Sequence, residues 1–213
     1  MTNIPPVTPK TDQSANATSF VKRIANLVAT NYGTSLGMVQ VALGELEYVA
    51  GTINRFVAPD ARRVKRLVFV CLGNFNRSPF ASALACAHGA CATSVGLWTS
   101  PGVPASGKAI ETAAFFGIDL TAHRTKGIAD YRFEEGDLLL AMEIRHALQL
   151  AQMGIPSAQI ALLGHWATPH RIHIHDPHLL TGAYFRSCFS ILNVAVLNLI
   201  DHLKLDASPS INR

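Results

Sequence analysis

The sequence predicts an α/β fold, in which a small parallel sheet carries helices on both faces and follows an α-helical extension. Two observations lead to this prediction. After residue 64, short continuous apolar runs, typical of strands buried on both faces, alternate with segments of helical periodicity. Before that point, apolar residues recur at helical spacing. With 49% hydrophobic residues among 213, the chain can also bury a substantial core.

Composition and pattern divide the chain into four parts. Residues 1–17 are rich in Pro, Thr, Ser and Asn, and we expect them to be disordered. Residues 18–63 are a helical extension that ends in a linker at 59–63. Residues 64–206 are the α/β domain, and residues 207–213 are a flexible C-terminus.

The extension is expected to form a hairpin of two amphipathic helices, over residues 19–31 and 35–56. Polar residues interrupt the second helix before an apolar run of about 18 residues is reached, so we expect no membrane span. Three interpretations stay open: the hairpin covers the α/β domain, joins two chains in a homodimer, or binds a membrane surface or another partner. Its apolar positions are Phe20, Ile24, Leu27 and Val28 in the first helix, and Val39, Ala42, Leu46, Val49 and Ile53 in the second.

Strands and helices alternate through the α/β domain. Right-handed crossovers in such a chain place the C-terminal ends of all parallel strands at one edge of the sheet, where ligands bind. Cys71 lies at the end of the first strand and therefore at this edge. The predicted strands cover residues 67–71, 93–99, 138–142 and 160–163, and the predicted helices cover 79–88, 108–116, 143–153 and 184–203.

The loop after the first strand holds Cys71 and Arg77, six positions apart. Gly73-Asn74 tolerates unusual backbone angles, and Ser78-Pro79 is a natural start for a helix. A loop that curls from a strand end into a helix start points its N–H groups inward and forms an anion-sized nest. The predicted anion-binding residues are Leu72, Gly73, Asn74, Phe75, Asn76 and Ser78.

This loop has the parts needed for attack on phosphorus. The helix N-terminus and the loop N–H groups favour the thiolate form of Cys71. The planar guanidinium of Arg77 matches two oxygen atoms of a phosphate group. A nucleophile, an oxyanion cradle and a charge clamp are thus predicted in one loop.

The loop sequence CLGNFNRSP resembles the active-site loop of the low-molecular-weight protein tyrosine phosphatases, usually C-x-G-N-x-C-R-S-P. The resemblance covers about residues 65–204 and implies a small four-stranded, doubly wound fold. It also implies a cysteine-dependent phosphatase that forms a phosphocysteine intermediate. Downstream, it rests on Ser100–Gly102, Gly117–Leu120 with His123, Asp137–Glu143, Leu162–Gly164 and Asp176-Pro177.

A phosphatase of this kind needs a carboxylic acid to protonate the leaving group and then to activate water. Asp176 is the best candidate, because it follows the strand-like segment 171–175 and precedes Pro177, which makes the loop rigid. An Asp-Pro pair at this place supplies the general acid in the resembled family. Glu143 is a further candidate for the acid. A solvated or capping role is expected for the remaining candidates, Asp119, Asp130 and Asp137.

The resemblance implies supporting roles for three further residues. Ser78 would stabilise the thiolate when phosphocysteine breaks down, in addition to capping the helix. Asn74 would hold the loop backbone through hydrogen bonds of its side chain, and His123 would support Asn74. The catalytic residues are then Cys71, Arg77 and Asp176, with Asn74, Ser78 and His123 as loop support.

The sequence departs from the family pattern around the substrate pocket. Asn76 replaces the second loop cysteine, and His178 and Leu179 follow Asp-Pro where the family usually has aromatic residues. The segment 102–107, on the opposite wall, has no aromatic residue, although Phe75 could supply one apolar wall. Phosphotyrosine is therefore the expected substrate, and a smaller or non-aromatic phosphoester is the alternative.

Composition limits the partners and the compartment. The net charge of +4 includes no long Lys/Arg run, so we expect no nucleic acid partner. The N-terminus has no signal-peptide pattern and the four cysteines form no disulfide framework, so a cytoplasmic protein is expected. Neither a metal nor a cofactor is expected, because Ile172 and Ile174 would form the buried face and leave the neighbouring histidines solvated. These are His165, His170, His173, His175 and His178.

Two other functions stay open. An arsenate reductase-like oxyanion enzyme would need further cysteines that carry a disulfide outward, and Cys86 and Cys91 are instead predicted where the first domain helix ends. A catalytically weak phosphate-binding or scaffold protein would use the N-terminal hairpin for its biology. The joint presence of the predicted catalytic residues favours the phosphatase, whose substrate is a phosphorylated protein or a small phosphoester.

Overall fold

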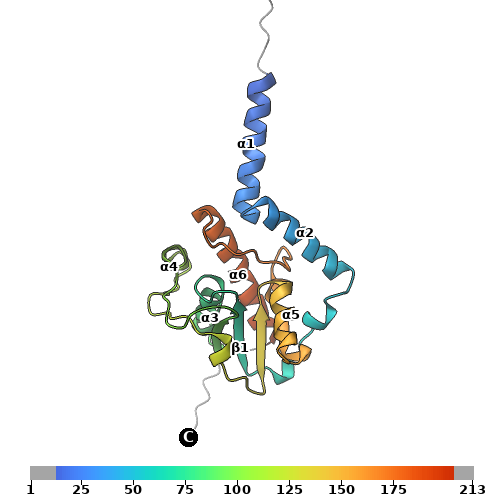
Figure 1. Cartoon of the computed structure of the whole chain (residues 1–213), viewed down its shortest axis with the longest axis vertical. Helices are drawn as coiled ribbons and strands as arrows, with labels where there is room; N and C mark the ends of the chain where they lie inside the picture. The colour runs from blue at the N-terminus through green and yellow to red at the C-terminus, as the bar shows by residue number, and fades with distance from the viewer. Residues whose placement is uncertain (1–12, 204–213) are drawn as a thin grey trace, which may run out of the picture.

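The computed structural model describes residues 13–203 and contains one sheet of four parallel strands (Figure 1). The strand order is β2-β1-β3-β4, so β1 and β3 are central. This arrangement confirms the predicted α/β fold. The strands are β1 Arg66–Cys71, β2 Ala92–Gly96, β3 Asp137–Ala141 and β4 Ile160–Leu162.

The sheet register brings the strand ends together at one edge. Cys71, the last residue of β1, lies opposite Gly96 of β2, and Val70 lies opposite Ala141 of β3. Because all strands are parallel, the loops that leave their C-terminal ends share this edge. The loop after β1 is therefore bordered by the loops after β2 and β3.

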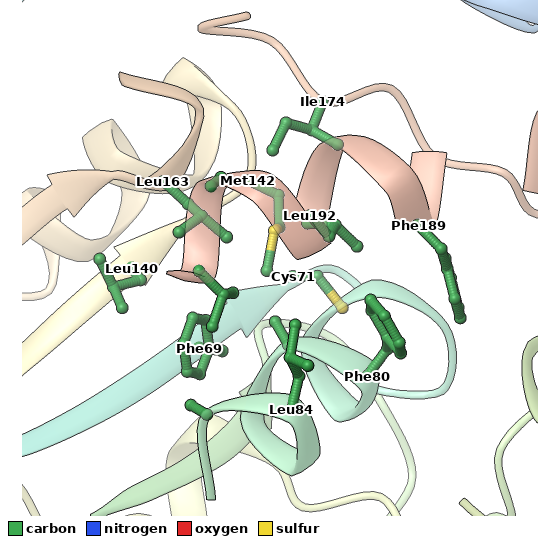
Figure 2. Packing of buried hydrophobic residues seen from close by; sticks show 14 of the residues in the cluster. Phe69, Cys71, Phe80, Leu84, Leu140, Met142, Leu163, Ile174, Phe189 and Leu192 are labelled. Atoms are coloured by element: carbon green, nitrogen blue, oxygen red, sulfur yellow. The ribbon is translucent and has the colours of Figure 1, made fainter. Parts of the chain in front are cut away.

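One face of the sheet packs against α3, α4 and α6. Phe69 and Cys71 of β1 point to this face, where Phe80 of α3 stacks on Phe189 of α6 with ring centroids 4.2 Å apart. Figure 2 shows the Cys71 side chain among these buried apolar residues. The base of the loop is thus held by a close-packed core.

The opposite face packs against α5 and against the end of the extension. Val68 and Val70 of β1 share this second core with Leu150 of α5. Ile53 and Phe56, which lie in the extension, are also buried in it, and Phe56 has no exposed surface. The extension therefore contributes side chains to this second core, on the face of the sheet that packs against α5.

The helices of the domain lie within a few residues of their predicted positions. α4 begins after Ser106, whose hydroxyl accepts a hydrogen bond from the Ala109 N–H group and caps the helix. The α-helices are α3 Arg77–Ala87, α4 Gly107–Ala114, α5 Ile144–Gln152 and α6 Gly182–Leu203. The short 3-10 helices are η1 Asn54–Phe56, η2 Ala61–Arg63, η3 Ile128–Asp130, η4 Ser157–Gln159 and η5 Leu163–Trp166.

The extension forms α1 (Gln13–Tyr32) and α2 (Ser35–Val49), and α1 projects away from the sheet in Figure 1. α1 begins at Gln13, inside the segment 1–17 for which disorder is predicted, and the last proline before it is Pro9. Residues 1–12 and the predicted flexible C-terminus 207–213 lie outside the described residues.

The second predicted helix ends earlier than expected. α2 stops at Val49 because Gly51 adopts a left-handed φ of 74°, and the chain then turns into η1. Four of the apolar positions predicted for this helix are exposed, namely Val39, Ala42, Leu46 and Val49, while the fifth, Ile53, lies beyond α2 and is buried. The buried stripe of α2 consists of Gly37, Val41 and Gly44. α2 thus packs through its small residues.

Among the described residues, α6 is the one helix long and apolar enough to cross a membrane. Its apolar residues Phe185, Phe189 and Leu192 belong to the core between the sheet and helices α3, α4 and α6. A core helix of a soluble domain passes the same test of length and composition, and the packing of α6 accounts for its apolar character.

Candidate active site

The loop from Cys71 to Ser78 curls around the sulfur atom of Cys71. The Asn74 N–H group donates a hydrogen bond to Cys71 Sγ at 3.3 Å, and Ser78 Oγ lies 3.0 Å from the same sulfur. Asn74 has a left-handed φ of 53°, which turns its N–H group inward. Both predicted contacts of the thiol, with a loop amide and with Ser78, are present.

The buried side chain of Asn74 connects three parts of the site. Its Nδ2 atom donates to Ser78 Oγ and to Ser94 Oγ, each at 2.9 Å. Its Oδ1 atom accepts a hydrogen bond from the Lys126 N–H group at 2.8 Å. Every polar atom of this amide group thus has a partner, which offsets the strain of the left-handed backbone.

His123 contacts the loop from the outside. Its Nε2 atom lies 2.7 Å from the carbonyl oxygen of Asn74. Burial lowers the pKa of His123, so the ring is neutral near pH 7 and Nε2 carries the proton that is donated to this carbonyl. These are the contacts that a loop-supporting role requires.

Other loop residues are held by the neighbouring segments. The Oδ1 atom of Asn76 accepts a hydrogen bond from Ser106 Oγ at 2.6 Å, so the residue that replaces the family cysteine ties the loop to the start of α4. A Cβ atom on Gly73 would collide with the Phe75 ring, so a larger residue there would force this ring to move. The carbonyl oxygen of Leu72 accepts the Trp98 N–H group at 2.9 Å.

Arg77 is fully buried and is held by two carboxylates. Its Nη1 atom donates to Glu143 Oε1 at 2.6 Å and to the Ile174 carbonyl at 2.7 Å. Its Nη2 atom donates to Asp176 Oδ2 at 2.7 Å, while Nε has no hydrogen-bond partner. Burial disfavours the charged guanidinium, but the charges of Asp176 and Glu143 outweigh it and raise the pKa of Arg77.

Glu143 is a site residue to which sequence reasoning assigned no role. It is buried between Arg77 and Arg145, whose Nε atom donates to Glu143 Oε2 at 2.6 Å. Burial opposes its ionisation, but the Arg77 charge outweighs this and holds the pKa of Glu143 below its usual value. Its position directly after β3, at the ligand edge of the sheet, was the signal that could have identified it.

The other acidic candidates lie away from Cys71. Asp119 accepts a hydrogen bond from the Thr121 N–H group in a local turn and is exposed, as expected. Asp137 begins β3 at the opposite end of the sheet, where it pairs with Arg66 at 2.8 Å. Asp137 is buried rather than solvated, because this ion pair compensates its charge, and its Oδ2 atom accepts a hydrogen bond from the Glu134 N–H group at 2.9 Å in a local turn.

The segment before Asp176 is not a strand. It runs as an extended loop, and the Ile174 N–H group donates to the Met142 carbonyl at 3.0 Å. Ile172 and Ile174 are buried as predicted. His173 is buried too, so the expectation of solvated histidines is wrong for this residue.

The reason for the burial of His173 is that both faces of the segment are covered. Glu143 Oε2 lies 3.8 Å from His173 Nε2 on one side, and Gly44 of α2 lies on the other. Burial lowers the pKa of His173 to about 4. Across the described residues 13–203, no group of three or more His, Cys, Asp or Glu residues is arranged to hold a metal ion.

The mouth of the site has one aromatic wall. The Phe75 and His178 rings meet edge to face, with centroids 5.1 Å apart. Trp98, which sequence reasoning did not consider, follows β2 at the same edge of the sheet, and 84% of it is exposed. Leu179, which was expected at a family aromatic position, is also exposed.

All four cysteines are free. Cys86 and Cys91 are exposed near the end of α3, and burial raises the pKa of Cys188 to about 12. The polar contacts of Cys71 Sγ go to Ser78 and Asn74 rather than to another thiol. Cys71 thus makes no hydrogen bond to a second thiol, the kind of partner with which an oxyanion reductase would form a disulfide.

Comparison with known proteins agrees with this geometry. The EpsP protein of Ralstonia nicotianae, a probable low molecular weight protein-tyrosine-phosphatase, is 35% identical over 82 residues, which cover 38% of this chain and 57% of EpsP. The low molecular weight protein-tyrosine-phosphatase Wzb of Escherichia coli K12 is 30% identical over 129 residues, which cover 59% of this chain and 86% of Wzb.

A solved structure shares the fold. The YwlE arginine phosphatase from Geobacillus stearothermophilus superimposes with a TM-score of 0.59 at 26% identity, covering 66% of this chain and 93% of YwlE. A sequence model described as low molecular weight phosphotyrosine protein phosphatase matches residues 66–208, which leaves α1 and α2 outside the match. The chain therefore belongs to the low molecular weight phosphotyrosine protein phosphatase family.

Proposed function

We propose that this protein is a cysteine-dependent phosphatase that hydrolyses phosphotyrosine, or another phosphomonoester, through a phosphocysteine intermediate. One observation carries the proposal. The Cys71 sulfur sits in a nest at the start of α3, and the adjacent Arg77 guanidinium is hydrogen-bonded to Asp176, the expected general acid. Nucleophile, cation and acid thus belong to one small site.

In the first step, the Cys71 thiolate attacks phosphorus and the bond to the ester oxygen breaks. The loop N–H groups and Arg77 bind the non-bridging oxygens, and Asp176 gives a proton to the leaving oxygen. Nη1 of Arg77 stays on Glu143 and Ile174, so Nε and Nη2 form the fork that faces phosphate. Asp176 must then leave Nη2 and turn toward the leaving group.

In the second step, water attacks the phosphocysteine and the sulfur–phosphorus bond breaks. Asp176, now a carboxylate, accepts a proton from the water. Ser78 Oγ, 3.0 Å from Cys71 Sγ, donates to the departing thiolate. Asn74 and His123 hold the loop in place during both steps. The proposed chemistry uses side chains and amides of this chain alone.

The substrate is proposed to be a phosphorylated tyrosine in a protein. The names of Wzb and EpsP describe tyrosine phosphatases, whereas that of YwlE describes an arginine phosphatase. The edge-to-face pair of Phe75 and His178 at the mouth supports an aromatic leaving group. Rates with matched phosphotyrosine and phosphoarginine peptides decide between these substrates, and faster phosphoarginine turnover contradicts the proposal.

We also propose a cytoplasmic homodimer. The hairpin of α1 and α2 exposes many apolar side chains, which a second copy of the hairpin would cover. Sedimentation equilibrium should give a dimer for the wild type and a monomer for Leu43→Glu, and a monomeric wild type contradicts this idea. The exposed apolar residues are Phe20, Val21, Ile24, Leu27, Leu36, Met38, Val39, Leu43, Leu46 and Val49.

Hydrolysis of p-nitrophenyl phosphate by the reduced full chain tests the proposed function. Activity that is abolished in Cys71→Ser and strongly reduced in Asp176→Asn supports the mechanism. A folded, reduced wild type without activity overturns it. In that case, arsenate reduction with a thiol reductant and phosphopeptide binding would test the oxyanion reductase and scaffold alternatives.

A further inference from the structure

The segment that leads to Asp176 is supported by the N-terminal extension. Glu45 of α2 accepts the N–H group of Ile172 on its Oε1 atom at 2.8 Å. Its other oxygen, Oε2, lies 2.7 Å from His170 Nδ1. A single carboxylate of the extension thus holds two positions of the loop, 127 and 125 residues further along the chain.

This contact fills a gap in the hydrogen bonds of the loop. Within the α/β domain, the Gly164 carbonyl accepts a hydrogen bond from the Arg171 N–H group, and the Met142 carbonyl accepts one from the Ile174 N–H group. The N–H group of Ile172, a residue with no exposed surface, is satisfied by Glu45 instead. Because residues 171–175 pair with no strand, this bond replaces part of the support that a sheet would give.

Two glycines of α2 face this loop, and an added Cβ atom would be too close at Gly37 but would make ordinary van der Waals contact at Gly44. A Cβ atom on Gly44 would lie 3.5 Å from His173 Cβ and from Ile172 Cγ2. A Cβ atom on Gly37 would lie 2.9 Å from the His175 ring. The buried stripe of α2 therefore rests directly on the residues before Asp176.

The junction between α1 and α2 contacts the loop on both sides of Asp176. On one side, Arg171 donates to the Asn31 carbonyl at 3.1 Å and stacks over the Tyr32 ring at 4.8 Å. On the other side, a Cβ atom on Gly33 would lie 2.6 Å from Leu180. The extension thus contacts the loop both before and after the acid.

We propose that the extension positions Asp176 for catalysis and that Glu45 is the positioning residue at the centre of this contact. Glu45 touches neither the phosphate loop nor the reacting atoms, and it acts by fixing Ile172 and His170. This inference rests on the proposed function, because it concerns proton transfer by Asp176. It assigns a catalytic purpose to a part of the chain that the family match does not include.

The experiment compares Glu45→Ala with Glu47→Ala in the full chain. Glu47 is an exposed residue of the same helix, so the matched change has the same effect on helix propensity. The readout is kcat/KM for two substrates. Phenyl phosphate expels a basic phenoxide that needs a proton, whereas p-nitrophenyl phosphate expels a stabilised anion that needs one much less.

Glu45→Ala should lower kcat/KM for phenyl phosphate about tenfold and for p-nitrophenyl phosphate by less than about threefold, a fraction of what general acid catalysis contributes. Glu47→Ala should match the wild type. Glu45→Gln, which keeps an acceptor for the Ile172 N–H group, should restore most of the loss. Hydrogen exchange of peptides covering residues 170–176 should be faster in Glu45→Ala than in Glu47→Ala.

Two results overturn the inference while leaving the proposed function intact: an active Glu45→Ala variant with no loss, or an equal loss on both substrates. A wild type that hydrolyses neither substrate overturns the proposed function and this inference with it. If Glu45→Ala does not fold, Gly44→Leu tests the same contact by pushing α2 away from His173 and Ile172. It should show the same selective loss, and an unselective one contradicts the proposal.

Discussion

The phosphate loop and the Asp176 segment are built in opposite ways. In the loop, Cys71, Asn74 and Ser78 bond to one another within a few positions of sequence. In the segment, Ile172 and Asp176 bond to Glu45 and Arg77, 127 and 99 residues away. The contacts of the proposed nucleophile are thus mostly local in sequence, whereas the proposed acid depends on the tertiary fold, as does Arg77, which joins the two regions. Variants that separate the two regions test this difference.

The largest effect is expected from Cys71→Ser in the phosphate loop. A serine hydroxyl lacks the thiolate on which the mechanism depends, so kcat for p-nitrophenyl phosphate should fall by about 10⁴-fold or more. Because Ser78 and the Asn74 N–H group remain, the loop should still bind inorganic phosphate, measured by calorimetry. Cys91→Ser, an exposed cysteine, is the control and should keep full activity. Substantial turnover by Cys71→Ser would contradict a phosphocysteine intermediate.

Arg77→Lys should have the next largest effect, because Arg77 joins the two regions. A lysine keeps the charge beside Glu143 but loses the planar fork and the bond to Asp176. We expect kcat/KM for p-nitrophenyl phosphate to fall about 10³-fold. The exposed Arg186→Lys is the matched control. A loss below about tenfold would mean that charge alone, without the fork, binds phosphate.

Asp176→Asn tests the second region by itself. The amide can still contact Arg77 but cannot transfer a proton, so kcat should fall about 10²-fold while phosphate binding by the loop persists. The loss should be larger with phenyl phosphate than with p-nitrophenyl phosphate. Asp130→Asn, on an exposed position, should behave as the wild type. Equal losses on both substrates would assign Asp176 a structural role through Arg77.

The two regions also explain what sequence could predict. The apolar run of β1, Gly73-Asn74 and Ser78-Pro79 place Cys71 and Arg77 in a loop without knowledge of the rest of the chain. Asp176 was predicted from the strand-like segment before it, from Pro177 after it and from the family resemblance, and the structure puts its carboxylate on Arg77. The strand expected before it is absent, because alternating His and Ile satisfies a strand pattern whether or not a neighbour pairs with it.

The residues that sequence reasoning missed depend on long-range packing. In the sequence, Glu143 looks like an ordinary residue at the start of the helix after β3. Its contact with Arg77 depends on the register between β1 and β3. The extension was expected to pack through its apolar face, but α2 packs through Gly37, Val41 and Gly44. Periodicity of apolar residues cannot reveal a contact made by glycines and one carboxylate.

Asn74→Ala should have a moderate effect that is confined to the phosphate loop. The change leaves the Lys126 N–H group and the Ser94 hydroxyl without a partner and places an alanine at a φ of 53°. We expect about 2 kcal/mol lower stability in urea and a loss of about tenfold or more in kcat. Asn198→Ala, a hydrogen-bonded asparagine of α6 distant from the loop, controls for a general loss of stability. Unchanged kcat in Asn74→Ala would remove Asn74 from the support of the loop.

The smallest effect, on the acid dependence of stability, is expected in the Asp176 segment. Burial lowers the pKa of His173 to about 4, whereas an unfolded histidine titrates near 6.5. Above pH 6.5, His173 is neutral in both the folded and the unfolded state and does not contribute to the pH dependence of stability. Between pH 6.5 and about 4, His173 is protonated in the unfolded state but neutral in the folded state, so the free energy of unfolding falls as the pH falls.

Between pH 6.5 and 5 the loss from His173 should reach up to about 2 kcal/mol, at about 1.4 kcal/mol per pH unit. Urea unfolding at a series of pH values should show this slope in the wild type and a shallower one in His173→Gln. His88→Gln, at an exposed position after α3, should leave the slope unchanged. The buried His146, whose pKa burial lowers to about 3, adds to the slope in every variant, so the comparison with His88→Gln isolates His173. If His173→Gln kept the full slope, the Asp176 segment would not be closed around His173, and the contrast between the two regions would weaken accordingly.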